Sequence, residues 1–288
     1  MATRVIMAGL SLAAAVTLAT SAHASSVTTI WGNSASSGAP LLQEWDLSGN
    51  LLDTIHAPHG FNGRGVVQVG NILYYTSAGA NGVYAYNFVT NTDLGTVFTV
   101  AGSSGLATMA WDGHAFYIGD YSGTNNVYKY SPTGTLLQTI PLSQCSSFCD
   151  GLEYANGHLV SNRYDGGAGG ANTYDVYDLN GNLLQSALMT GHDSSGNTGI
   201  AFDGTDYYVS NIFHQSLSVY DSSGNYLHDI TLQTGGNPTF VEDLSVNYTA
   251  VLTGVPEPGS WALMLLGVGS LGVSLRASRR KAALATTA

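Results

Sequence analysis

The segment Leu42–Leu52 reads LQEWDLSGNLL, and the segment Tyr174–Leu184 reads YDVYDLNGNLL. Each segment alternates apolar and polar residues, turns at Ser-Gly-Asn or Asn-Gly-Asn, and continues into two leucines, which is the pattern of a β-hairpin. Further copies are Leu217–Leu227 (LSVYDSSGNYL), Tyr128–Leu137 (YKYSPTGTLL) and a looser one from Val83 to Leu94. One kind of hairpin therefore recurs through most of the chain.

An aromatic residue occupies the same place in every copy, with spacings of 41, 44, 47 and 43 residues: Trp45, Tyr86, Tyr130, Tyr177 and Tyr220. A period of about 40–50 residues made of strands and turns indicates a β-propeller. A second hairpin precedes the first in each complete unit, with turns at Val69–Asn71, Asp112–His114, Asn156–His158 and Asp203–Thr205. Four strands per unit make one blade, and no stretch between the two termini has helical periodicity.

The two ends of the repeat array are incomplete in complementary ways. Thr28–Ile55 holds strands two to four of a blade, whereas Val241–Tyr248 resembles a first strand without followers. Pairing Val241–Tyr248 with Thr28–Trp31 completes a fifth blade and removes both exposed edges. An open four-bladed array would leave those edges exposed, and a sixth blade lacks residues. We therefore predict an all-β fold, a five-bladed propeller over residues 25–252 with one blade shared between its ends.

The blade hairpin also resembles the NHL-type repeats of secreted propellers, through its Tyr-Asp-x-x-Gly-Asn pattern. This resemblance implies the same propeller fold and no particular activity.

The N-terminal residues 1–24 have the pattern of a signal peptide. Arg4 is the only charge before the apolar or small run Val5–Thr20, and Ala22–Ala24 (AHA) fits a small-x-small cleavage site. We predict cleavage after Ala24 and export of the remaining chain. A retained membrane anchor is the alternative, and the short Ala-rich run fits it less well.

The C-terminal segment has three parts in a fixed order. A linker, residues 253–258, contains the motif Val255, Pro256, Glu257 and Pro258. Residues 259–275 form a run of 17 residues without a charge, which as a helix is about 25 Å long and near the short limit for a membrane span. The tail, residues 276–288, carries the basic cluster Arg276, Arg279, Arg280 and Lys281. Such a cluster holds the C-terminus on the cytoplasmic side.

These three parts together resemble the PEP-CTERM sorting signal of exported proteins from Gram-negative bacteria that make exopolysaccharide. The resemblance implies an exosortase as partner, which recognises the signal and processes the chain near the Pro-Glu-Pro motif. It also implies export across the inner membrane, anchoring by the C-terminal helix, and release to the cell surface or extracellular matrix. The alternative is an ordinary C-terminal anchor that no sorting enzyme reads.

The charge and cysteine content bound the function further. The chain has 8 Lys and Arg against 19 Asp and Glu, a net charge of −11, and residues 25–254 alone carry −15 from 3 basic and 18 acidic residues. Such a surface repels phosphate backbones, so we expect no nucleic-acid partner. Cys145 and Cys149 are expected to form a disulfide in an exported protein. A metal-binding pair is the rival interpretation, although no His is close in sequence.

Polar residues end the second strand of every blade and should ring one mouth of the central channel: Asn33, Ser77, Asp120, Asn162 and Asn211. Oxygen ligands so placed could hold calcium. We favour the alternative that they hydrogen-bond strand ends and channel water, because only Asp120 is charged. We therefore commit to no metal or cofactor.

Other polar candidates are expected on the same face: His56, His59, Arg64, Asp150, Arg163, Asp165, His192, Asp193, His214, Glu242 and Asp243. No pair has a recognisable catalytic spacing, and neither a Gly-x-Ser-x-Gly elbow nor a His-Glu-x-x-His motif is present. We expect a non-catalytic module that binds exopolysaccharide or a surface protein.

Two other functions stay open. One is a calcium-dependent hydrolase, since Asn33, Asp120, Asn162 and Asn211 are faintly similar to the metal ring of gluconolactonase-like propellers, which have six blades and a Glu ligand. The other is a purely structural spacer. Bound metal would separate the first from the rest, and ligand retention would separate a binding module from a spacer.

Overall fold

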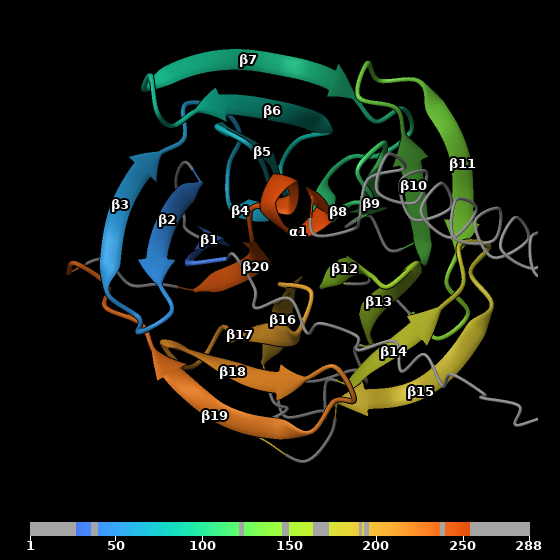
Figure 1. The fold of residues 1–288 in the computed structure, drawn as a ribbon. Coiled ribbons are helices and arrows are strands. Elements are labelled where there is room, and N and C mark those ends of the chain that lie inside the picture. The colour runs from blue at the N-terminus through green and yellow to red at the C-terminus, as the bar shows by residue number, and fades with distance from the viewer. Residues whose placement is uncertain are drawn as a thin grey trace, which may run out of the picture.

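The computed structural model describes residues 27–35, 40–120, 124–145, 150–163, 173–189, 192, 196–236 and 240–253. Twenty strands in this part of the chain form five four-stranded antiparallel sheets. The sheets are arranged as a ring around a central axis (Figure 1). The prediction of an all-β, five-bladed propeller is confirmed.

Each blade extends from an innermost strand at the axis to an outermost strand at the rim of the ring (Figure 1). In that order, the shared blade is β20 (Val241–Ser245), β1 (Thr29–Ser34), β2 (Leu41–Asp46) and β3 (Leu51–His56). Blade two is β4 (Gly63–Val69), β5 (Ile72–Ser77), β6 (Gly82–Asn87) and β7 (Thr92–Thr99). Blade three is β8 (Leu106–Trp111), β9 (Phe116–Asp120), β10 (Asn126–Tyr130) and β11 (Leu136–Pro141). Blade four is β12 (Leu152–Ala155), β13 (His158–Arg163), β14 (Thr173–Tyr177) and β15 (Leu183–Met189). Blade five is β16 (Asn197–Phe202), β17 (Asp206–Asn211), β18 (Ser216–Asp221) and β19 (Tyr226–Thr231).

The repeated outer hairpin is held by its own turn residues. Asp46 Oδ1 accepts hydrogen bonds from Ser48 N and Asn50 N, both at 2.9 Å, and Asp46 Oδ2 accepts one from Asn50 Nδ2 at 2.8 Å. Gly49 has a φ of 83°, a conformation that costs other residues energy. The turns that begin at Asp178 and Asp221 make the same contacts. The Asp-x-x-Gly-Asn pattern therefore encodes the turn between the two outer strands.

The five aromatic anchors form the contacts between blades. All are at most 9% exposed, and each lies in a different hydrophobic cluster that joins its own blade to a neighbouring one. Trp45, for example, packs with Leu217 and Ile230 of blade five, and its Nε1 donates to Gln233 O at 2.8 Å. Replacing such a residue by Ala typically costs about 3–5 kcal/mol. The repeat period is thus the number of residues between one aromatic contact that joins two blades and the next such contact.

The ring closes through the shared blade, as predicted, but in a different register. In β20 and β1, Ser245 pairs with Trp31 and Asp243 with Asn33, whereas we predicted Thr28–Trp31 as the partner segment. The innermost strand is shifted toward the end of β1, where a bulge at Asn33 and Ser34 leaves Glu242 as an extra residue. Closure is therefore confirmed, and the predicted register was wrong.

One short helix, α1 (Tyr248–Thr253), was not expected from the sequence. Figure 1 shows it on the axis, over the end of the ring at which the innermost strands finish. Asn247 precedes it, pairs with Gln68 in an isolated parallel bridge, and its Oδ1 accepts from Thr249 N at 3.1 Å. Tyr248 is 2% exposed. Two turns of helix are too short to show a hydrophobic period, so no pattern in the sequence indicated this helix.

The predicted signal peptide, residues 1–24, lies outside the described residues. So do the membrane-spanning run 259–275 and the basic tail. Within the part of the chain that is described, no helix is long and apolar enough to cross a membrane.

Candidate functional site

The two ends of the ring axis differ in what covers them. We call the Arg64 end the one at which the innermost strands β4, β8, β12, β16 and β20 begin. The second strands of the blades finish there, because neighbouring strands are antiparallel. We call the opposite end, which α1 covers, the α1 end (Figure 1).

Hydrogen bonds identify an equivalent position in three blades at the Arg64 end. Thr76 Oγ1 accepts from Gly65 N at 2.8 Å, and Ser210 Oγ accepts from Gly199 N at 2.9 Å. Ser161 Oγ donates to Gly151 O at 3.0 Å from the same place in blade four. In each case a hydroxyl near the end of the second strand bonds the backbone near the start of the first strand, and that start is irregular in blades two and five. Arg64, Asp150 and Thr198 come just before these three glycines, and Ala107 and Glu242 lie in the irregular starts of the innermost strands β8 and β20.

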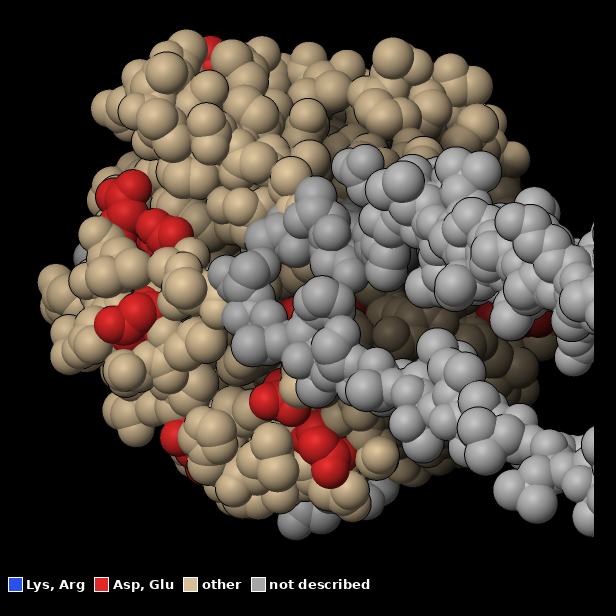
Figure 2. Space-filling model, viewed as in Figure 1, with Lys and Arg blue, Asp and Glu red and all other residues tan. Residues whose placement is uncertain are grey.

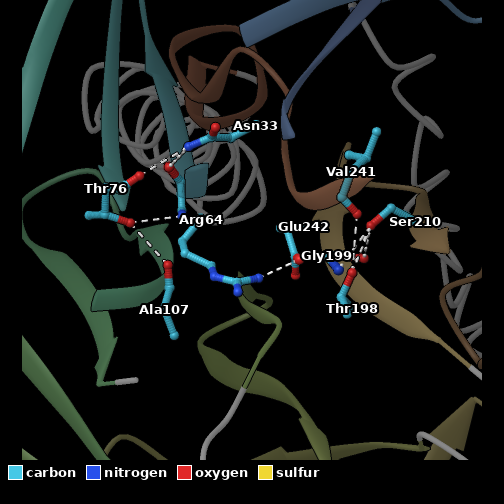
Figure 3. A network of polar contacts seen from close by, with 10 residues as sticks. Asn33, Arg64, Thr76, Ala107, Thr198, Gly199, Ser210, Val241 and Glu242 are labelled. Atoms are coloured by element: carbon cyan, nitrogen blue, oxygen red, sulfur yellow. Dashed lines mark hydrogen bonds and ion pairs between the residues drawn. The ribbon is translucent and has the colours of Figure 1, made fainter. Parts of the chain in front are cut away.

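Three of these five residues are charged, and they interact. Arg64 of blade two is 8% exposed, and its Nη1 forms an ion pair with Oε1 of Glu242, which belongs to the shared blade and is 6% exposed. Figure 3 shows the Arg64 side chain reaching from its strand toward Glu242. Asp150, just before β12 of blade four, acts electrostatically on both partners. Three blades thus contribute one charged residue each to this end of the axis.

Burial dominates the protonation of these carboxyl groups. It raises the pKa of Glu242 to about 7, the negative charge of Asp150 adds to the rise, and the Arg64 guanidinium opposes it. Burial likewise raises the pKa of Asp150, against the lowering effect of Arg64. The site therefore holds one guanidinium and two carboxyl groups whose ionisation is coupled.

Asp243, the residue after Glu242, ties three blades together near the axis. It is fully buried, and its Oδ2 accepts from Val66 N at 3.2 Å, Met109 N at 3.0 Å and Thr108 Oγ1 at 2.9 Å. Burial raises the pKa of this carboxyl well above its usual range, although the three donors favour its charged form. The second oxygen, Oδ1, has no hydrogen-bond partner among the described residues.

The predicted ring of polar strand ends is buried throughout: Asn33, Ser77, Asp120, Asn162 and Asn211 are each at most 4% exposed. Asn33 Nδ2 donates to Gly65 O at 2.9 Å and Thr76 O at 3.2 Å, and Asn162 Nδ2 donates to Asn197 O at 2.6 Å. These are contacts between neighbouring strand ends.

Asp120, the charged member of the ring, accepts from three hydroxyls, the most distant being Tyr128 OH at 3.4 Å from Oδ2. Ser103 Oγ donates to its Oδ1 at 2.9 Å and Thr124 Oγ1 to its Oδ2 at 3.0 Å. The described residues contain no group of three or more His, Cys, Asp or Glu side chains that could hold a metal. Calcium binding by the ring stays a hypothesis.

The histidines on the candidate face lie apart from the charged cluster. His59 Nε2 is 2.8 Å from Asp93 Oδ2 of the outermost strand, and His192 Nε2 is 3.1 Å from Asp229 Oδ2. Each imidazole also stacks on a tyrosine, His59 on Tyr84 and His192 on Tyr226. The structure therefore brings together Arg64, Asp150, Glu242 and Asp243 from the predicted candidates, and it places these two histidines against residues of the outermost strands β7 and β19.

Five predicted candidates remain, of which three are among the described residues. Arg163 faces Asp175, with Nε 3.8 Å from Oδ2. His56 ends the outermost strand of the shared blade, and His214 follows β17. Asp165 and Asp193 lie outside the described residues.

Sequence reasoning missed the role of Glu153. This fully buried residue lies on the innermost strand β12, and its Oε1 accepts from Tyr154 N at 2.6 Å and from Tyr248 OH of α1 at 2.5 Å. Its Oε2 accepts from Phe202 N at 2.9 Å. Burial raises the pKa of Glu153 to about 8. The signal was a Glu within the apolar run of a strand that the repeat places next to the axis.

Cys145 is buried, with its Sγ 3.8 Å from Ser161 Oγ. Cys149 lies outside the described residues, so the disulfide stays a prediction. The motif Val255–Pro258 lies outside them as well.

Comparisons with solved structures show the fold. A nidogen/laminin complex matches with a TM-score of 0.52 and 10% identity over 76% of this chain and 98% of that chain. A protein of unknown function from Bacteroides caccae matches with a TM-score of 0.52 and 10% identity over 77% and 99% of the two chains. No curated protein matches.

One family model matches the C-terminal segment. Residues 254–281 match the PEP-CTERM protein-sorting motif, the same segment in which the sequence shows Pro-Glu-Pro, an apolar run and a basic cluster. The chain is therefore a five-bladed β-propeller that carries a PEP-CTERM protein-sorting motif, and this motif implies export and exosortase-dependent processing.

Proposed function

We propose that the propeller is a non-catalytic binding module of a cell-surface or extracellular-matrix protein, and that it binds polysaccharide or a protein at the Arg64 end. The observation that carries this proposal is the cluster of Arg64, Glu242 and Asp150, in which the ion pair is buried. It lies at the end of the axis opposite α1.

This cluster is costly for folding. A buried ion pair loses hydration that its mutual attraction repays only in part, and well-packed apolar residues of similar volume are often as stable or more so. The raised pKa of Glu242 is a direct sign of that cost. Buried, coupled charges of this kind are frequent at functional sites, so a ligand that pairs with them accounts for their presence better than stability does.

The chemistry of the cluster fits binding rather than reaction. One guanidinium and two carboxyl groups offer hydrogen-bond donors and acceptors at fixed positions. A ligand rich in hydroxyl or amino groups suits two carboxyl groups best.

The rest of the chain positions this module. In our proposal the signal peptide, residues 1–24, is removed, and the helix 259–275 anchors the propeller outside the inner membrane. An exosortase then acts near Glu257 and releases the propeller to the cell surface or matrix. The support for this order of events is the match of residues 254–281 to the sorting motif.

The test compares binding by the full chain, purified in detergent, with binding by Glu242→Gln and Asp150→Asn. Each substitution keeps the side-chain shape and removes a charge, so we expect at least a tenfold loss of affinity for exopolysaccharide or a captured surface protein. Lys129→Met is the matched control, because it breaks an ion pair with Asp112 on blade three, at 3.1 Å, away from the axis.

Three outcomes would contradict the proposal. Equal affinity for all four proteins would place the ligand elsewhere. A folded protein that retains no ligand at all would indicate a spacer, and calcium-dependent turnover of a lactone would indicate the hydrolase.

A further inference from the structure

Three phenylalanines are exposed at the Arg64 end. Phe61 is 54% exposed, Phe213 is 60% exposed and Phe240 is 47% exposed. Exposing large aromatic side chains forgoes the stabilisation that their burial would give. The other described phenylalanines are buried or half-buried, so exposure is a property of this end of the ring.

The three residues occupy nearly the same place on three adjacent blades. Each of these blades has a backbone hydrogen bond between the loop after its second strand and the segment before its first strand: Ala35 N to Phe240 O, Ala78 N to Asn62 O, and Ile212 N to Gly196 O. Phe240 is itself a partner in such a bond, and Phe61 and Phe213 each adjoin one. The blades concerned are blade five, the shared blade and blade two, whose innermost strands β16, β20 and β4 are neighbours. The phenylalanines therefore form an arc beside the charged cluster.

Two of the rings rest on glycine. A β-carbon at residue 196 would lie 2.3 Å from Cδ2 of Phe213, and one at residue 79 would lie 3.6 Å from Cδ1 of Phe61. Gly196 thus lets the ring of Phe213 lie directly against the backbone. Backing by glycine supports one side of an aromatic ring and leaves the remainder exposed as a platform.

Buried polar strand ends lie next to these platforms. Asn33 pairs with Asp243 at the end of β1 in the shared blade, and Asn211 Oδ1 accepts from Phe213 N at 2.8 Å. Exposed aromatic rings on adjacent blades, beside the carboxyl groups of Asp150 and Glu242, suit a polymer of repeating sugar units. The C–H face of a pyranose stacks on the negative face of an aromatic ring, and its hydroxyls bind amides and carboxylates.

Charge selects among polysaccharides. The described part of the chain has three basic residues, Arg64, Lys129 and Arg163, and Arg64 and Lys129 form ion pairs with acidic partners. Residues 25–254 carry a net charge of −15, and Figure 2, which views the α1 end, shows several acidic residues and no Lys or Arg on the described surface there. An anionic polymer would be repelled by this field, whereas amino groups would be attracted.

We propose that the ligand is a neutral or amino-sugar polysaccharide that follows the arc of Phe240, Phe61 and Phe213. Its sugar rings stack on the phenylalanines, and its hydroxyl or ammonium groups bind Asp150 and Glu242. This inference rests on the proposed function and names the ligand class and the residues that select it.

The experiment measures binding of four hexasaccharides to the full chain in detergent by calorimetry. The probes are cellohexaose and chitohexaose, which are neutral, a glucosamine hexamer, which is cationic, and a galacturonate hexamer, which is anionic. We expect binding of the first three and at least tenfold weaker binding of the anionic one. Phe61→Ala, Phe213→Ala and Phe240→Ala should each weaken binding about three- to tenfold, and the Trp variants should restore it.

Matched controls separate loss of a platform from loss of exposed apolar surface. Leu52→Ala and Leu184→Ala remove side chains that are each 53% exposed on outermost strands. Both should bind like the unsubstituted chain. All five alanine variants should keep the same thermal midpoint, because none removes a buried group.

The outcomes distinguish this inference from the proposed function. If Glu242→Gln lowers glycan affinity but the phenylalanine variants do not, the arc is wrong and the binding site stands. Preference for the anionic hexamer overturns the ligand class alone. If no probe binds but a protein does, in a manner that depends on Glu242, the glycan inference fails and the proposed function stands. Glycan binding that depends on neither set of residues overturns both.

Discussion

Buried carboxyl groups lie at both ends of the ring axis, and the two ends treat them differently. At the α1 end, Glu153 has both oxygens satisfied, by Tyr248 OH and by two backbone N–H groups. At the Arg64 end, Glu242 Oε2 and Asp243 Oδ1 have no hydrogen-bond partner among the described residues. The ring therefore satisfies both oxygens of Glu153, whereas Glu242 and Asp243 each keep one oxygen without a donor.

The difference has a physical meaning. An unsatisfied buried polar atom costs about 1–3 kcal/mol, and folded proteins satisfy nearly all of them. Glu153 is fully satisfied, although other buried polar atoms also lack a partner among the described residues, such as Gln43 Oε1 and, near α1, Gln68 Oε1. Spare acceptors beside a charged cluster are what a ligand or ordered water can use.

The largest effect is expected from removing β20, the strand that runs from the Arg64 end to the α1 end. Deleting Phe240–Tyr248 removes β20, including Asp243, and also Tyr248. We expect loss of cooperative unfolding of the whole propeller, because β1 and β4 lose their shared neighbour and the ring gains open edges. Thermal unfolding and solubility measure this. A soluble truncated protein with an unchanged midpoint would show that closure is unimportant.

The next largest effect is on the dependence of stability on pH. The folded-state pKa of Glu242 is raised from 4.5 to about 7 and that of Glu153 from 4.5 to about 8, both chiefly by burial. The folded protein therefore holds these protons more tightly than the unfolded chain, so its stability is full below about pH 4.5 and falls as each group ionises. A tenfold difference in proton affinity between the folded and unfolded chain corresponds to about 1.4 kcal/mol. Asp150 and Asp243, whose pKa values are also raised, add to the same slope.

Urea unfolding between pH 4.5 and pH 9 measures this prediction and separates the two ends. Glu242→Gln should remove the loss of stability that ends near pH 7. Glu153→Gln should remove the loss that continues to about pH 8. Equal and parallel curves for the two variants and the unsubstituted chain would show that neither carboxyl group has a raised pKa.

A smaller effect is expected from Tyr248→Phe, which removes one hydrogen bond to Glu153 at the α1 end. The free energy of unfolding should fall by about 1–3 kcal/mol, because Glu153 Oε1 loses one of its two buried donors. Ligand affinity at the Arg64 end should not change. Urea unfolding and a binding titration together test this, and a loss of affinity without a loss of stability would contradict the separation of the two ends.

The smallest effect on the propeller is expected from changes outside the ring. Pro256→Ala combined with Pro258→Ala alters the sorting motif and should leave the thermal midpoint unchanged. Release of the protein from membranes should decrease in a host that has an exosortase, as measured by immunoblot of membrane and medium fractions. Unchanged release would indicate that these prolines are not read.

The fold could be predicted because its determinants are local and repeated. Asp46 and Gly49 specify the hairpin turn within a few residues, and anchors such as Trp45 recur at the spacing of blade contacts. The closing register could not be predicted, since it depends on a bulge at Asn33 that shifts the pairing. A repeat pattern gives the order of strands, and side-chain contacts decide their alignment.

The candidate site was predicted only in part for the same reason. Arg64, Asp150 and Glu242 were predicted to lie on one face, but no spacing in the sequence singled out these three, which only ring closure brings together. Their equivalence depends on hydrogen bonds such as Gly65 N to Thr76 Oγ1, which no periodicity shows. The exposed phenylalanines carried no signal either, because an aromatic residue near a strand usually packs inside.

The position of α1 also determines how the molecule bears mechanical load. Thr253 is the last described residue, and α1 lies on the ring axis at the end opposite Arg64. A pulling force applied to α1 passes into β20 along the direction of that strand. The hydrogen bonds between β20 and β1 are then loaded together in shear, rather than broken one after another. Asp243 transmits part of this load to the innermost strands of blades two and three through its three donors. A tethered propeller that grips a polymer at its far end would thus resist drag with three blades at once.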